Sequence, residues 1–386
     1  MAQKKRRTKV IIVFVIFIVY FFIAARPVPR ETILAQKWIS SLNSMHIPAE
    51  NEPIRLSEQL VPFTLGAHFG YVNLFGQFEL NRIMADNVYL DRNMWAEYGA
   101  QPASIVVNNI SENTQITVEN AWGYPVLLDN RVFILGSEQN SLSEIGNDGN
   151  VLWTYEFGAP ITCIDVAAGL VVTGSLDGAV EVFNSSGERI YYFEPDGSRY
   201  SVILGCAISR NGSRIAVISG IDQQRFLLLE RLGSSGGEYR VVHHEFLETG
   251  FRRPVHVLFV DEDRRIIFER EGGIGSFNIR SRRGIYIPLD GEIVAIDNSG
   301  DQGFLFLITS ASARLLMGQE KRLVGIRFPP DRFFGSYRIA ARDAIFLTAP
   351  FRSDDVFLGR IRAEGSSSIL VTGGGSTLIS FDLEEK

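Results

Sequence analysis

An internal repeat of 38 residues constrains the fold of this chain more than any other feature. Residues 131–154 align without a gap on residues 169–192, so that Val132–Ser137 fall on Leu170–Ser175. Each copy predicts a strand, a Gly-Ser turn, a second strand, a turn with Asn, Asp or Ser before Gly, and an aromatic strand. One small sheet of this kind cannot bury both of its faces, so neighbouring copies must stack on each other.

Three weaker copies follow the repeat, and each offers four candidate strands within roughly forty residues. They span residues 200–247, 254–289 and 290–328. In the last copy the candidate strands are residues 292–296, 303–307, 313–316 and 323–326. A four-stranded unit of this length is what one blade of a β-propeller requires.

The two ends of the repeating region are less regular. Strand-like runs occur in residues 66–107, in residues 336–364 and from residue 369 onward. We expect the first strands after residue 63 to complete the blade begun near the carboxyl end, because closed propellers often combine both ends of the chain. The sequence therefore predicts an all-β fold, a β-propeller of about seven four-stranded blades over residues 63–386, with six or eight allowed. A β-sandwich pair would not give a gapless repeat, and an open solenoid usually has shorter coils.

The amino terminus predicts a membrane anchor. Residues 10–25 are apolar throughout, and five cations precede them in residues 1–9. Under the positive-inside rule, residues 1–9 form a short cytoplasmic tail, residues 10–25 a transmembrane signal anchor, and the rest is translocated. A cleaved signal peptide is the alternative. It is disfavoured because the run stays bulky up to Ile23 and Arg26-Pro27 follows at once.

Residues 26–62 are predicted to connect the anchor to the propeller. Glu31–Met45 has apolar residues at helical spacing, which predicts a short juxtamembrane helix. These apolar residues are Ile33, Leu34, Trp38, Ile39 and Leu42. Residues 46–62 contain three prolines and are predicted to be a linker.

The charge distribution argues against a nucleic-acid partner. The whole chain carries −6, and because residues 1–25 carry +5, the remainder carries −11. Phosphate binding needs a basic face, which an acidic body does not supply. The local basic group Arg280, Arg282 and Arg283 is interpreted as a solvated turn.

The five histidines do not form a recognisable metal or acid–base motif. They are His46, His68, His243, His244 and His256. No pair has the His-Glu-x-x-His spacing of a helical zinc site. His243 and His244 are adjacent, so on a strand their side chains point to opposite faces. We interpret all five as structural or surface residues.

Glycine-rich and acidic stretches are interpreted as turns. The glycine clusters are residues 233–237, 272–275 and 373–375, and the acidic clusters are Asp261–Asp263 and Asp354–Asp355. None of the glycine clusters carries the lysine of a phosphate loop, and neither acidic cluster has the alternating ligands of a calcium loop. Residues 261–264 are predicted to be a hairpin tip. The sequence thus predicts no catalytic residue, no metal site and no cofactor, and it leaves any cofactor-binding residues unknown.

The two cysteines do not decide the compartment. Cys163 and Cys206 both lie in apolar, strand-like runs. A disulfide between neighbouring strands and a pair of buried thiols are both consistent with the sequence. The thiols are favoured, since the chain has no dense cysteine framework.

Part of the repeat resembles a known family. Residues 148–155, followed by 158–161, resemble the repeat of PQQ-like (quinoprotein-type) propellers, and residues 176–180 also resemble WD40-like propellers. The resemblance covers residues 121–193 and implies the fold more than a function. Some such relatives are quinone-dependent dehydrogenases, and others are envelope scaffolds, among them a propeller lipoprotein that assists outer-membrane barrel assembly. The chain lacks vicinal cysteines, the lipoprotein's lipid-bearing cysteine and a Trp-Asp dipeptide with its Gly-His partner.

These patterns favour a non-enzymatic scaffold. We expect a single-pass protein of a bacterial inner membrane whose propeller lies in the periplasm and binds a protein partner of the cell envelope. The lipid bilayer is contacted through residues 10–25. The alternatives are a PQQ-like dehydrogenase, or a ligand-binding sensor, that uses the central funnel of the propeller. The sequence does not determine the partner, the face that binds it, or the oligomeric state.

Overall fold

The computed structural model divides into two compact units, residues 1–35 with 383–386, and residues 36–382. It describes four residues near the amino terminus and nine further segments of the chain. The segments are residues 32–43, 60–233, 237–248, 250–297, 304–311, 320–327, 344–351, 356–362 and 368–385. Phe14, Val15, Phe17 and Tyr20 are the four, and they are helical and exposed.

The predicted anchor and tail fall largely outside these described residues. Apart from the four helical residues, nothing of the predicted tail 1–9 and anchor 10–25 is described. In the part of the chain that is described, no helix has both the length and the apolar character needed to cross a bilayer. The linker predicted at residues 46–62 also lies outside the described residues, except for its last three.

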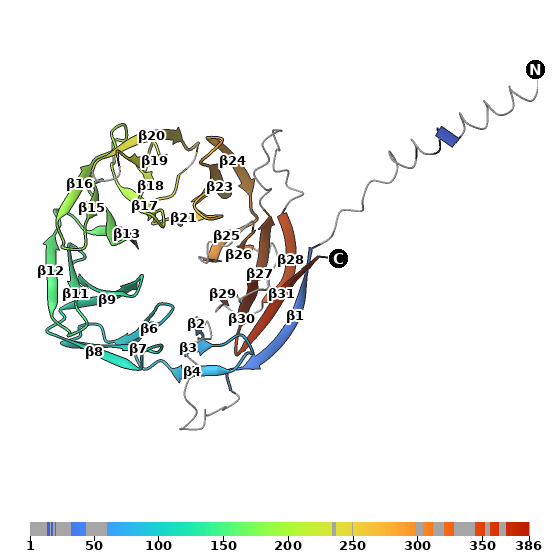
Figure 1. Ribbon diagram of the computed structural model, residues 1–386, viewed down its shortest axis with the longest axis horizontal. Helices are drawn as coiled ribbons and strands as arrows, with labels where there is room; N and C mark the ends of the chain where they lie inside the picture. The colour runs from blue at the N-terminus through green and yellow to red at the C-terminus, as the bar shows by residue number, and fades with distance from the viewer. Residues whose placement is uncertain are drawn as a thin grey trace, which may run out of the picture. The chain divides into compact units, whose positions relative to one another are not determined.

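The described strands form eight antiparallel sheets, seven with four strands and one with three. Figure 1 shows them arranged in a ring, and we number them as blades 1–8 in chain order. Blade 1 holds β2 (Val61–Leu65), β3 (His68–Val72) and β4 (Phe78–Ile83). Blade 2 holds β5 (Asn87–Leu90), β6 (Met94–Tyr98), β7 (Ser104–Asn109) and β8 (Thr114–Glu119). Blade 3 holds β9 (Gly123–Leu128), β10 (Arg131–Gly136), β11 (Ser141–Ile145) and β12 (Val151–Glu156). Blade 4 holds β13 (Ile161–Ala167), β14 (Leu170–Ser175), β15 (Val180–Phe183) and β16 (Arg189–Phe193).

The second half of the ring follows the same order, with the innermost strand first. Blade 5 holds β17 (Ile203–Ile208), β18 (Arg214–Ser219), β19 (Arg225–Arg231) and β20 (Tyr239–Phe246). Blade 6 holds β21 (Val257–Val260), β22 (Arg265–Arg270), β23 (Gly273–Asn278) and β24 (Arg283–Pro288). Blade 7 holds β25 (Glu292–Ile296), β26 (Phe304–Ala311), β27 (Glu320–Arg327) and β28 (Ala344–Phe351). Blade 8 holds β29 (Val356–Arg362), β30 (Ser368–Gly374), β31 (Thr377–Glu385) and, as its outermost strand, β1 (Thr32–Ser41).

The all-β propeller prediction is confirmed, and the blade count is the upper allowed value, eight. The 38-residue repeat corresponds to the consecutive blades 3 and 4. The copies predicted over residues 200–247 and 254–289 are blades 5 and 6. Blade 7 differs from its prediction, because residues 323–326 lie in its third strand, β27, and its fourth strand, β28, comes later in the chain. The long connection between these two strands interrupts the forty-residue period. The strand predicted at residues 313–316 lies outside the described residues.

The helix predicted over Glu31–Met45 is wrong. The chain there forms β1, which pairs with β31 and completes blade 8, so the completing strand precedes residue 63. The apolar spacing fits a strand as well, because residues 38, 40 and 42 share one strand face. Trp38 Nε1 donates a hydrogen bond to the Leu74 carbonyl at 2.8 Å, Ser40 Oγ donates to the Gly76 carbonyl at 2.6 Å, and Leu42 is buried. The free edge of β31 supplies a hydrogen-bond ladder that the local sequence does not reveal.

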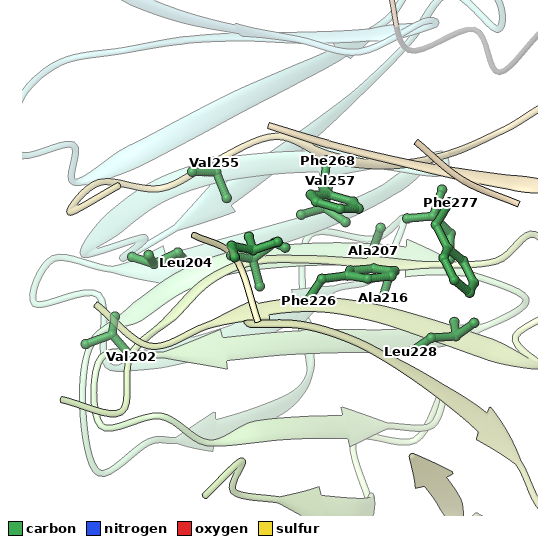
Figure 2. Close-up of a cluster of buried hydrophobic side chains, with 13 residues drawn as sticks. Val202, Leu204, Ala207, Ala216, Phe226, Leu228, Val255, Val257, Phe268 and Phe277 are labelled. Carbon is green, nitrogen blue, oxygen red and sulfur yellow. The ribbon is translucent and has the colours of Figure 1, made fainter. Parts of the chain in front are cut away.

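The core lies between blades, as the stacking argument requires. Between blades 5 and 6, the rings of Phe226 and Phe268 stack with their centres 4.5 Å apart, and Phe277 packs against Phe226 at 5.4 Å (Figure 2). All three rings are buried. Burying one such side chain contributes roughly 1.5–3 kcal/mol, so each pair of adjacent faces stabilises both blades.

Candidate functional site

A groove of about 520 Å³ lies between blades 5 and 6. Its floor is apolar and comes from both blades. Leu228 of β19 and Val242 of β20 belong to blade 5, whereas Phe277 and Ile279 belong to blade 6. These strands alternate side chains between two faces, and the face that each turns toward its neighbour becomes the floor.

The rim of the groove is charged. Its arginines are Arg214, Arg264, Arg280 and Arg282, and its carboxylates are Glu230, Glu262 and Asp263. Most of the rim comes from turns at one end of the blades, between the first and second strands or between the third and fourth. The solvated turn predicted at Arg280, Arg282 and Arg283 is such a turn, and two of its arginines line the groove.

Ion pairs hold part of this rim in place. Arg214 pairs with Glu230 at 3.1 Å, and Arg264 pairs with Asp261 at 2.7 Å. The Asp263 carboxylate accepts a hydrogen bond from the backbone N–H of Arg210 at 2.9 Å, which joins the first turns of blades 5 and 6. The groove therefore combines a fixed apolar floor with paired charges, as protein interfaces do.

His243 lies at the groove wall and is not arranged as a metal ligand. Its ring packs 4.3 Å from the Phe277 ring, centre to centre, and its Nε2 is 3.8 Å from Glu245 Oε2. Burial lowers the pKa of His243, partly offset by the Glu245 carboxylate. Burial thus favours the neutral imidazole, whose ring forms part of the aromatic wall. His244 instead contacts Phe246, in agreement with the predicted opposite faces.

The other histidines are separate from the groove. His68 hydrogen-bonds the Asn81 side chain at 3.0 Å, within blade 1. His256 is exposed, and its backbone pairs with Glu269. His46 lies outside the described residues. Across the part of the chain that the structure describes, no three His, Cys, Asp or Glu side chains are grouped to hold a metal ion.

The glycine clusters were predicted to be turns, and this is correct only in part. Gly272 and Gly375 sit between successive antiparallel strands, whereas Gly273 and Gly275 lie in β23 and Gly373 and Gly374 lie in β30. The predicted hairpin tip at residues 261–264 joins β21 to β22, and three of its residues have positive φ angles near 55–60°. In this tip Asp261 is buried against Arg264 and Arg265. Residues 234–236 and the acidic cluster at 354–355 lie outside the described residues.

Both cysteines are free thiols. Cys163 lies on β13 and Cys206 on β17, so they come from the innermost strands of blades 4 and 5. The Cys163 side chain hydrogen-bonds the Cys206 thiol, and this contact together with burial raises the pKa of Cys206 well above its usual value. A thiol held in its neutral form is a poor nucleophile.

A smaller cavity of about 250 Å³ lies toward the opposite end of blade 6 and reaches blade 7. It is lined by the turn Glu271–Gly273, by Glu269, and by residues 250–252 and 291–293. Glu269 is 2% exposed and accepts two hydrogen bonds from Arg253, at 2.7 and 3.2 Å. Its charge is thus compensated inside the fold.

Buried carboxylates that pair with arginines recur in the ring and were missed by sequence reasoning. Glu144 accepts hydrogen bonds from Arg131 at 2.6 and 2.7 Å, and from the Trp153 indole at 2.6 Å. Glu181 similarly accepts one from Arg189 at 2.9 Å. A carboxylate inside an otherwise apolar strand was the available signal, since a buried charge requires a partner.

Comparison with known proteins agrees with this architecture. A family described as beta-propeller protein matches residues 1–362. The chain belongs to this family. An uncharacterized protein of Treponema pallidum (strain Nichols) is 25% identical over 356 residues, which cover 90% of this chain and 92% of that protein.

Two solved structures share the fold. BamB from Moraxella catarrhalis superposes with a TM-score of 0.55 at 10% identity, covering 91% of this chain and 100% of that one. The computationally designed Ika8 protein gives 0.55 at 13% identity, with 85% and 94% covered. At these identities the likeness extends to the fold alone. The finer PQQ-like and WD40-like resemblance, and with it the quinone-enzyme alternative, stays a prediction.

Proposed function

We propose that this protein is a non-enzymatic scaffold of the bacterial cell envelope, which binds a protein partner through its propeller. The observation that carries the proposal is the groove between blades 5 and 6, where an apolar floor is surrounded by arginines and carboxylates. Binding hot spots cluster in well-packed pockets of an interface, and arginine is enriched among them.

The proposed location follows from the amino-terminal sequence. The basic residues 1–9 and the apolar residues 10–25 support a signal anchor that holds the propeller on the periplasmic side of the inner membrane. The propeller itself supports a binding role, because a ring of stacked sheets is rigid and presents preformed surfaces.

The groove can be tested by reversing the charge of its arginine rim. The full chain, expressed in its native host, is crosslinked in cells and purified, and the recovered proteins are quantified. We expect the double variant Arg280→Glu/Arg282→Glu to recover the specific partner at least about tenfold less well than wild type. Arg92→Glu, in the first turn of blade 2, is the matched control and should leave recovery unchanged.

Recovery of only abundant background proteins by wild type would contradict the scaffold function. Equal recovery by wild type and by the double variant would instead show that the groove is not the contact surface. A protease accessibility assay on intact and permeabilised cells tests the location, because a periplasmic propeller is cleaved only after the outer barrier is opened.

A further inference from the structure

Cys163 and Cys206 bring two sulfur atoms together from different blades. Cys163 lies on β13 and Cys206 on β17, the innermost strands of blades 4 and 5. The Cys206 side chain is buried, and the half-buried Cys163 packs against the same apolar cluster. The two side chains also share a hydrogen bond. A pair of thiols in contact across two blades is a candidate for covalent chemistry, because a disulfide needs two sulfurs that can approach each other.

Hydrogen bonds on either side of the cysteines hold the two strands beside each other. Thr162 Oγ1, next to the first cysteine, donates to the Ile203 carbonyl of β17. Asp165 Oδ2 accepts from the Ile208 backbone N–H of β17 at 2.7 Å. Both cysteines lie between these two contacts along their strands. The backbones of blades 4 and 5 therefore keep the two sulfurs within reach of each other.

Both sulfurs lie against β14, the second strand of blade 4. Cys206 Sγ is 3.9 Å from the Val172 carbonyl oxygen, so this side chain of blade 5 reaches into blade 4. The backbone of Gly174 hydrogen-bonds the Cys206 thiol, and a Cβ at Gly174 would lie 2.7 Å from Cys163 Sγ. The absence of a side chain at Gly174 thus leaves the space in which the two sulfurs meet.

The two thiols differ in their access to solvent. Cys163 is half-buried, whereas Cys206 is only 7% exposed. An external oxidant therefore reaches Cys163 first, and Cys206 can react only with a group already beside it. Redox-sensitive cysteines commonly combine an accessible thiol with a neighbouring thiol that resolves the first product. Contact with Cys163 compensates for the weak nucleophilicity of a buried thiol, because the second step occurs within one molecule.

We propose that Cys163 and Cys206 are a reversible oxidation site, which forms a disulfide between blades 4 and 5 when the chain meets a disulfide-bearing oxidant. The Cys163 thiolate attacks one sulfur of the oxidant's disulfide and expels the other as a thiolate. The Cys206 sulfur then attacks Cys163 Sγ and displaces the remaining sulfur of the oxidant. The two cysteines lose two electrons and two protons, and the oxidant takes up both and becomes two thiols.

The disulfide fastens one contact between neighbouring blades that otherwise depends on hydrogen bonds and apolar packing. Oxidants of this class maintain disulfides in extracytoplasmic compartments, which is where the proposed anchor would hold the propeller. The oxidation site goes beyond the protein-binding function and does not rest on it, since no partner protein takes part in the reaction.

Counting thiols on the purified full chain in detergent tests the proposal. The folded chain is treated with oxidised glutathione, unfolded in acid, alkylated and weighed by intact mass spectrometry. We expect the two alkylated thiols of the untreated chain to fall to none, without attached glutathione and without a covalent dimer. Tryptic mapping without reduction should recover residues 132–189 joined to residues 200–210. Wild type that keeps both thiols, forms a covalent dimer, or stops with glutathione on Cys163 would overturn the proposal.

Single variants test the role of each cysteine. Cys206→Ser should stop at a mixed disulfide between glutathione and Cys163, because the resolving thiol is missing. Cys163→Ser should keep Cys206 as an unmodified thiol, because its side chain is buried. Glutathione attached to Cys206 in the Cys163→Ser variant would overturn the assigned roles. The wild-type measurement stands by itself if either variant folds poorly.

Thermal unfolding gives an independent readout. We expect oxidised wild type to unfold at a midpoint at least about 3 °C higher than wild type kept in dithiothreitol. The double variant Cys163→Ser/Cys206→Ser is the control, and its midpoint should be the same under both conditions. Equal midpoints for oxidised and reduced wild type would overturn the stabilising effect of the bond. Neither experiment measures partner capture, so the oxidation site and the scaffold function can fail separately.

Discussion

Blade 5 and blade 1 use the same antiparallel ladder, but they differ in what lies beyond the third strand. In blade 5, β20 covers the third strand, and residues 215–218 of the central strand β18 are fully buried. In blade 1, β4 is the outermost of the described strands, and burial is lost along it from Phe78 to Ile83. Packing between neighbouring blades thus buries the inner strands in both blades. The fourth strand determines whether the outer edge of the third strand is covered.

Hydrogen exchange should show the largest difference between these two blades. Interior amides of β18 pair with β17 on one side and β19 on the other and exchange only when the propeller opens globally, whereas the outward amides of β4 have no partner strand among the described residues. We expect β18 to exchange at least about 10³-fold more slowly than the outward amides of β4 in the free chain. Mass spectrometry of the exchanged chain measures this, with β3 as the paired control in blade 1. Equal protection of β18 and β4 would mean that the rim of blade 1 is already covered.

Removing an aromatic ring should lower the free energy of unfolding much more in blade 5 than in blade 1. Phe226→Ala deletes a fully buried ring between blades 5 and 6, and we expect it to lower the free energy of unfolding by about 3–5 kcal/mol. Phe75→Ala removes an exposed ring in blade 1, so its effect should stay within about 0.5 kcal/mol. Urea unfolding of the full chain in detergent compares the two variants. A similar loss in both would show that Phe75 is packed against something outside the described residues.

Gly136 and Gly174 occupy equivalent positions in the 38-residue repeat. Replacing each of them tests how tightly neighbouring blades pack. A Cβ at Gly174 would lie 2.3 Å from Ile203 Cγ2 on blade 5 and 2.7 Å from Cys163 Sγ. At Gly136 it would meet the Ser141 hydroxyl oxygen, which can rotate away. We therefore expect Gly174→Ala to destabilise the fold by about 1–3 kcal/mol and Gly136→Ala by less than about 1 kcal/mol. Thermal unfolding of both variants measures the difference. Equal effects would indicate that blades 4 and 5 have more room between them than this contact allows.

The pH dependence of stability should depend on a carboxylate between blades 4 and 5. Asp165 accepts a hydrogen bond from the Ile208 N–H at 2.7 Å, but burial dominates and raises its pKa to about 6. A raised carboxyl pKa stabilises the fold at low pH, and this contribution is lost as pH rises through about 6. We expect unfolding free energy to fall by about 1–2 kcal/mol from pH 5 to pH 7 on this account. Asp165→Asn should flatten the profile, and an unchanged slope in that variant would exclude Asp165 as its source.

The regular part of the ring could be predicted from sequence because each blade contains its own signal. Blades 3 to 6 carry local strand patterns separated by turn residues, and their boundaries follow from those patterns alone. Blade 7 breaks the rule, since its fourth strand follows a long connection. Strand β1 is a second exception. The spacing of Trp38 and Leu42 is a local signal that suggested a helix, whereas the strand that pairs with β1 is β31, more than 300 residues later.

The candidate site could be predicted only in its parts. Arg280 and Arg282 were placed in a turn, which is correct, but a turn considered alone does not show what stands opposite it. The groove exists because Leu228 and Val242 of one blade face Phe277 of the next. The three described strands of blade 1 were likewise not predicted, because the short connection between Ile83 and Asn87 departs from the four-strand pattern of the other blades. The groove depends on how blades meet, which composition and periodicity do not determine.

The pairing of β1 with β31 has a consequence for biosynthesis. A ribosome makes Thr32–Ser41 long before Thr377–Glu385, so the outermost strand of blade 8 stays without its ladder until those later residues have been made. The ring therefore cannot close before β31 has left the ribosome, and the pairing of β1 with β31 is a late step of folding. Nascent chains that stall late would keep an unprotected strand, and they are natural substrates for holding chaperones and proteases.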